Sequence, residues 1–83
     1  MAFMTLELLL FGITKDIIGE SPFSFEIEDG QTAGDLMKAL VNKFPDLKNL
    51  NSIAIAVNGE YAQSTTLLKA EDEIALIPPV SGG

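Results

Sequence analysis

The chain places one helix-patterned segment between two groups of strand-patterned segments, and this order limits the folds open to it. The first group comprises Met4–Gly12, which is rich in residues that pack on a sheet, and Phe23–Ile27, which alternates strictly. Apolar residues then recur with a helical period at Leu36, Met37, Leu40, Val41 and Phe44. Because a single helix covers one face of a sheet, the order predicts an α+β domain: a small mixed sheet covered by one main helix.

The ends of this helix carry recognisable signals. Thr32 followed by Asp35 resembles a capping box in which Asp replaces the preferred Glu or Gln. Pro45 should end the helix, because the residue before a proline is displaced from the α conformation. We expect Gly12–Glu20 to be a connection between strands and Asp46–Ser52 to be polar and irregular.

The second half of the chain returns to strand patterns. Ile53–Val57 predicts a third strand, Asn58-Gly59 is a strong hairpin signal, and Glu60–Ala62 starts the returning strand. Glu73–Ile77 predicts the last strand. The order strand, strand, helix, strand, short strand, strand is that of a β-grasp sheet. In such a sheet the first and last strands lie side by side and parallel, and the helix supplies the crossover.

The first strand predicts two different sheet faces. Three leucines share the face that we assign to the core: Leu6, Leu8 and Leu10. The opposite face begins polar at Thr5 and Glu7 and becomes apolar at Leu9 and Phe11. We therefore expect Leu9 and Phe11 to belong to a surface that a partner covers.

The composition excludes several kinds of chemistry. The 83 residues contain no cysteine and no histidine, which rules out a thiolate nucleophile, an imidazole base and the usual metal sites. The formal charge is −7 and the five lysines are scattered, which argues against nucleic acid and favours a basic protein partner. The apolar N-terminal run lacks the features of a signal peptide and is too short to cross a bilayer. We therefore expect a cytoplasmic protein without membrane contact.

The last six residues have a different character: Pro78, Pro79, Val80, Ser81, Gly82 and Gly83. The prolines stiffen the base of this segment, and the glycines make the narrowest and most permissive end that a polypeptide can have. Fully extended, the segment would reach about 20 Å. We therefore predict a folded domain at residues 1–77 and a flexible C-terminal tail at residues 78–83, suited to being threaded into another protein's active site.

The stretch from Asp72 to Gly83 resembles the end of the small subunit of molybdopterin synthase, a family of ubiquitin-like sulfur carriers. It reads Asp-Glu-Ile-Ala-Leu-Ile-Pro-Pro-Val-Ser-Gly-Gly. Val57-Asn58 and the segment from Phe11 to Gly19 are also similar to that family. One residue departs from the pattern, since Glu71 stands where the family commonly has glycine. Glutamate at positive φ would be strained, so we expect a different turn at Ala70-Glu71.

The resemblance implies that Gly83 carries the chemistry. An adenylyltransferase of the ubiquitin-activating type would use ATP to adenylate its carboxylate, and a sulfur donor protein would convert it to a thiocarboxylate. The large catalytic subunit of molybdopterin synthase would then accept the tail, and sulfur would pass to a cyclic pterin precursor in molybdenum cofactor biosynthesis. The carrier would be a non-catalytic subunit of a heterotetrameric transferase and would bind no cofactor itself.

The resemblance also implies a partner interface at Phe11, Tyr61 and Ile77, and a basic residue at Lys15. Three alternatives stay open: a sulfur carrier for thiamine or tRNA thiolation, a protein modifier joined to lysines, and a non-catalytic β-grasp binding module. An independent enzyme is disfavoured, because the sequence offers no nucleophile paired with a base and no metal-ligand cluster.

Overall fold

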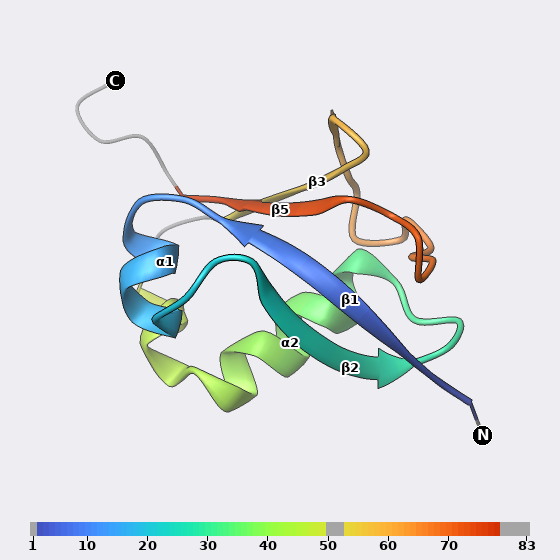
Figure 1. Cartoon of the computed structure of the whole chain (residues 1–83), viewed down its shortest axis with the longest axis horizontal. Coiled ribbons are helices and arrows are strands. Elements are labelled where there is room, and N and C mark those ends of the chain that lie inside the picture. The colour runs from blue at the N-terminus through green and yellow to red at the C-terminus, as the bar shows by residue number, and fades with distance from the viewer. Residues whose placement is uncertain (1, 50–52, 79–83) are drawn as a thin grey trace.

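Helices cover one face of a five-stranded sheet (Figure 1). The computed structural model describes residues 2–49 and 53–78 of the chain. The longest helix, α2 (Ala33–Lys43), crosses the sheet and is followed by the 3-10 helix η1 (Pro45–Asn49), while the short helix α1 (Ile13–Ile18) lies at one end of the sheet. Within the described ranges, no helix has the length and apolar character needed to span a membrane.

A parallel pair of strands forms the centre of the sheet. β1 (Phe3–Leu10) runs parallel to β5 (Ile74–Ile77), although the two are far apart in the sequence. β2 (Phe23–Glu28) is antiparallel to β1 on one side, and β3 (Ala54–Val57) and β4 (Glu60–Tyr61) extend the sheet beyond β5. The strand order β2-β1-β5-β3-β4 confirms the predicted β-grasp sheet and its parallel first and last strands.

The hydrophobic core fills the space between the sheet and α2. The two central strands bury alternate residues against α2: Leu6, Leu8, Leu10, Ile74 and Leu76. α2 contributes Leu36 and Leu40, both completely buried. Each fully buried leucine or isoleucine stabilises the fold by roughly 1.5–3 kcal/mol. The predicted core face of the first strand is therefore confirmed.

The predicted capping box at the start of α2 is present. The backbone N–H of Asp35 donates to the Thr32 hydroxyl at 3.2 Å, and the Asp35 carboxylate accepts from the Thr32 backbone N–H at 3.0 Å. The hydrogen bond from the Thr32 backbone, with a further bond from its hydroxyl, holds the pKa of Asp35 below its usual range. A shorter acidic residue thus performs the role usually taken by Glu.

Both connecting segments contain short helices that the sequence analysis did not predict. α1 packs Ile17 and Ile18 against the core and ends at Gly19, whose φ of 103° is a left-handed conformation that favours glycine. η1 begins at Pro45 and buries Leu47. The six residues of α1 make fewer than two turns, and this is too short to display a helical period in the sequence.

Strand ends differ from the prediction by one or two residues. β1 ends at Leu10, because the chain turns immediately afterwards. Ile53, Ala62 and Glu73 lie just outside the strands predicted to contain them. Ala62 nevertheless donates its backbone N–H to Ile55 at 2.7 Å and so stays attached to β3.

Candidate partner-binding face

The sheet face opposite α2, here called the outer face, carries a row of side chains from four neighbouring strands. The register aligns Leu9 with Ala75, Ala75 with Ala56, and Ala56 with Tyr61. The two alanines give the middle of the row small side chains, whereas Tyr61 at its end is large and 72% exposed. The row is apolar and has small side chains at its centre, which suits contact with a larger partner side chain.

Phe11 and Ile77 lie at the end of the outer face where β1 and β5 stop. Ile77 is half-buried and pairs with Ala54, while its neighbour Leu76 is buried on the core side, so the alternation of β5 places Ile77 on the outer face. Phe11 is 51% exposed, but it lies in the turn after β1 and not within the strand as expected. The contact of Phe11, Tyr61 and Ile77 with a partner stays a prediction.

A hydrogen-bonded turn follows Phe11 and fixes its backbone. The completely buried hydroxyl of Thr14 donates to the Phe11 carbonyl at 2.6 Å and accepts from the Phe11 N–H at 3.1 Å. The N–H of Lys15 donates to the Gly12 carbonyl at 3.1 Å, and the Lys15 side chain is exposed on α1. The sequence analysis overlooked Thr14, because its role depends on burial that α1 creates.

The predicted tail begins against this turn. Gly12 has a φ of 55°, and a Cβ atom at this position would lie 3.2 Å from Cγ of Pro78. Glycine therefore allows a close approach between the turn and the base of the tail. The remaining predicted tail residues lie outside the described part of the structure: Pro79, Val80, Ser81, Gly82 and Gly83.

The turn before β5 is held by side chains that the sequence analysis did not assign. The Asp72 carboxylate accepts from the Lys69 backbone N–H at 2.8 Å and from the Asn58 side-chain amide at 3.0 Å. The Glu73 N–H in turn donates to the Asn58 side-chain oxygen at 2.9 Å. Asn58 is the one non-glycine residue at positive φ in the described ranges, so Glu71 avoids the strain that glutamate would suffer there. The turn at Ala70-Glu71 is thus of a type that needs no glycine.

A hollow of about 290 Å³ lies between α2, the start of β3 and the segment after β4. Its lining includes Met37, Ile53 and Ala62 and no titratable side chain. It shares no residue with the row formed by Leu9, Ala75, Ala56 and Tyr61. We therefore place the candidate site on the outer face.

The strand order, the single long helix and the exposed sheet face beside the last strand define the class of ubiquitin-like β-grasp proteins. Within this class, the ThiS family matches residues 8–83, and the chain belongs to that family.

Relatives and solved structures agree with this placement. The molybdopterin synthase sulfur carrier subunit of Arabidopsis thaliana is 33% identical over 79 residues, which cover 94% of this chain and 82% of the relative. The crystal structure of small archaeal modifier protein 1 (SAMP1) from Haloferax volcanii has a TM-score of 0.78 at 32% identity, covering 95% of this chain and 99% of that one. A chain in the complex of subunits 1 and 2 of molybdopterin-converting factor from Helicobacter pylori has a TM-score of 0.60 at 34% identity, with 96% and 100% covered.

Proposed function

We propose that this chain is the sulfur carrier subunit of a molybdopterin synthase and acts in the cytoplasm during molybdenum cofactor biosynthesis. Its membership of the ThiS family and its similarity to the Arabidopsis carrier subunit support this role. Sulfur would travel on Gly83 at the end of the tail. Phe11, Tyr61 and Ile77 would contact the large catalytic subunit, a partner whose counterpart is present in the Helicobacter complex.

The observation that carries the proposal is the continuity between the outer face and the tail. Ile77 lies on the outer face, and Pro78 follows it directly against the turn at Gly12. A partner that covers the outer face is then within reach of residues 79–83, because five extended residues span about 17 Å. One binding event would both dock the domain and deliver the tail.

The chemistry begins with the low reactivity of a carboxylate, which is ionised at neutral pH. An adenylyltransferase would join AMP from ATP to the carboxylate of Gly83 and release pyrophosphate. Hydrosulfide supplied by a donor protein would then displace AMP and leave a thiocarboxylate, with no change in the oxidation level of sulfur. Transfer of that sulfur to the cyclic pterin precursor, with water supplying the replacement oxygen, would restore the carboxylate for another cycle.

Intact-mass spectrometry tests the carrier role. After incubation with ATP, sulfide and the activating enzyme, we expect one oxygen of the chain to be replaced by sulfur, and fragmentation should place the change at Gly83. A variant with one residue appended after Gly83 is the matched control and should stay unmodified while its fold is unchanged. An unchanged mass for the original chain, or full activity of the extended chain, would contradict the proposal.

A second candidate function is the modification of other proteins, which the similarity to SAMP1 favours. It would share the adenylation step but end in an isopeptide bond between Gly83 and a lysine. The same mass measurement separates the two roles, because a modifier would produce adducts on lysines. The carrier role predicts a thiocarboxylate without such adducts.

A further inference from the structure

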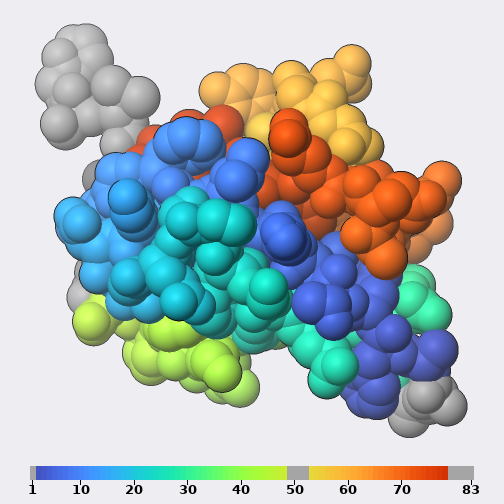
Figure 2. All heavy atoms as spheres, viewed as in Figure 1, coloured from blue at the N-terminus to red at the C-terminus, as the bar shows by residue number. Residues whose placement is uncertain are grey.

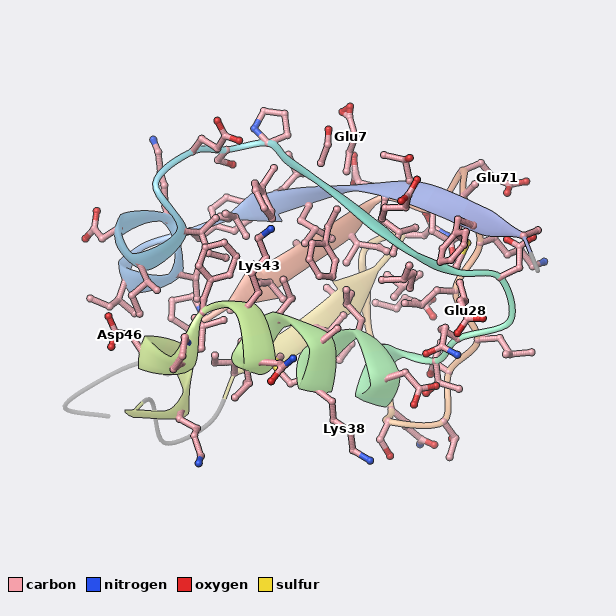
Figure 3. All side chains as sticks on the ribbon, turned by 90° about the horizontal axis from the view of Figure 1, so that it is seen from below. Glu7, Glu28, Lys38, Lys43, Asp46 and Glu71 are labelled. Carbon is pink, nitrogen blue, oxygen red and sulfur yellow. The ribbon has the colours of Figure 1, made fainter. Side chains whose placement is uncertain are left out.

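The net negative charge of the protein comes from the strands and the turns at their ends, and not from the helices. The helical layer, residues 12–22 and 31–49, contains four acidic residues and four lysines and is neutral overall. The strands and the turns at their ends contain eight acidic residues and one lysine, which accounts for the whole charge of −7. In Figure 3, Glu7 projects from the side of the sheet opposite α2, whereas Lys38 points away from α2 on the other side. Glu7 and the acidic turn before β5 therefore place part of this charge on the side of the outer face.

Several of these carboxylates surround an open hollow of about 450 Å³. Leu9, Pro22 and Ala70 supply its apolar lining. Its acidic lining consists of Glu7, Glu71, Asp72 and Glu73. β1 (blue) and the turn before β5 (orange), which supply most of this lining, lie side by side in Figure 2 although they are distant in the sequence.

The four carboxylates differ in the hydrogen bonds that they already accept. Asp72 is held by the Lys69 N–H and the Asn58 amide, as described above. Among the described residues, no hydrogen bond is donated to the side chains of Glu7, Glu71 or Glu73. A hollow with an apolar lining and unengaged carboxylates matches a lysine or arginine side chain. Its methylenes can pack on the lining while its charged end meets the carboxylates.

We propose that the partner that covers the outer face inserts a lysine or arginine side chain into this hollow. The inference rests on the proposed function, in which that partner is the large synthase subunit. Leu9 belongs both to the hollow and to the apolar row, so the two form one continuous surface.

This basic contact would set the orientation of the partner. Glu7 lies three residues before Leu10, where β1 ends, a separation of about 10 Å along the strand. The hollow and the end of the outer face at Phe11 are thus two separate contact sites for a partner, arranged along the direction of β1. Binding at both points would align the partner's active site with the end of β5 where Pro78 leaves the sheet, and reversed docking would lose the ion pairs.

The test compares two triple variants that change the net charge equally. Glu7→Gln, Glu71→Gln and Glu73→Gln remove three of the four carboxylates of the hollow and leave Asp72, which holds the turn. Asp16→Asn, Glu20→Gln and Asp46→Asn remove three exposed carboxylates of the helical layer. Association with the purified large subunit is measured for both variants and the original chain at low and high salt, with thermal unfolding to confirm equal folding.

We expect the hollow variant to bind roughly tenfold more weakly at low salt and to lose much of the salt dependence, whereas the control binds like the original chain. Equal weakening of both variants, or no weakening of either, would overturn the inference and leave the proposed function intact. Failure of the original chain to bind the large subunit at any salt concentration would instead contradict the proposed function.

Discussion

The two faces of the central sheet are built from the same strands but follow opposite design rules. Toward α2, β1 and β5 present Leu8, Ile74 and Leu76 with no exposed surface. On the outer face, the same strands present the half-buried Leu9 beside Ala75. Close packing favours large side chains on the first face, whereas the second has small residues between the half-buried Leu9 and the exposed Tyr61. Along each of these strands, residues that stabilise the fold thus alternate with residues that are available to a partner.

The largest expected effect comes from a neighbouring pair on β1. Leu8→Ala should destabilise the domain by about 2–5 kcal/mol, because it opens a cavity at a completely buried position. Leu9→Ala, one residue further, should cost less than about 1 kcal/mol and should instead weaken partner binding. Urea unfolding measures the first quantity. Similar losses of stability in both variants would show that the faces are not separated in this way.

A larger side chain at the centre of the apolar row should produce the next largest effect, a loss of affinity for the partner. Ala75→Leu adds bulk between Leu9 and Ala56 without touching the core side. We expect the free energy of unfolding to change by less than about 1 kcal/mol, while affinity for the large subunit falls roughly tenfold, since overpacked contacts cost about 1–3 kcal/mol. Titration calorimetry measures the affinity, with Thr5→Leu as a control on the same face of β1. Unchanged affinity would show that the apolar row is not part of the interface.

We expect an intermediate loss of stability from a change in the turn that follows Phe11. Thr14→Val keeps the shape of the side chain but removes the hydroxyl that serves both the N–H and the carbonyl of Phe11. The two bonds are part-buried, and each contributes about 0.5–1.5 kcal/mol, so we expect a loss of about 1–3 kcal/mol. Thr14→Ser should retain most of the hydrogen bonding and serves as the comparison. Wild-type stability in the valine variant would contradict this role.

The smallest effect concerns a site away from both faces, the capping box of α2. Because its folded-state pKa is lowered, the Asp35 carboxylate contributes stability above its unfolded pKa and loses it as the pH falls through the folded value. Asp35→Asn should therefore flatten the decline in stability on acidification below about pH 4. Urea unfolding at a series of pH values measures the slope. A slope identical to that of the original chain would remove Asp35 from the acid response.

Features encoded in neighbouring residues could be predicted from the sequence, and features that depend on the assembled sheet could not. The capping box at Thr32 and the hairpin at Asn58 depend on residues at most three apart. The link between Asn58 and Asp72 joins residues 14 apart and exists only once β3 and β5 have paired. α1 was overlooked because it is short, and the acidic hollow because Glu7 and Glu71 come to line it only once β1 and β5 have paired.

The central position of β5 has a consequence for how the protein is made. A ribosome releases the chain from its N-terminus, so β1, β2 and α2 emerge before the strand that must lie between β1 and β3. A chain interrupted before Ile74 would lack the middle of its sheet, and the pairing of distant segments is slow to form. Completion of the sheet therefore has to wait until the last strand has been synthesised.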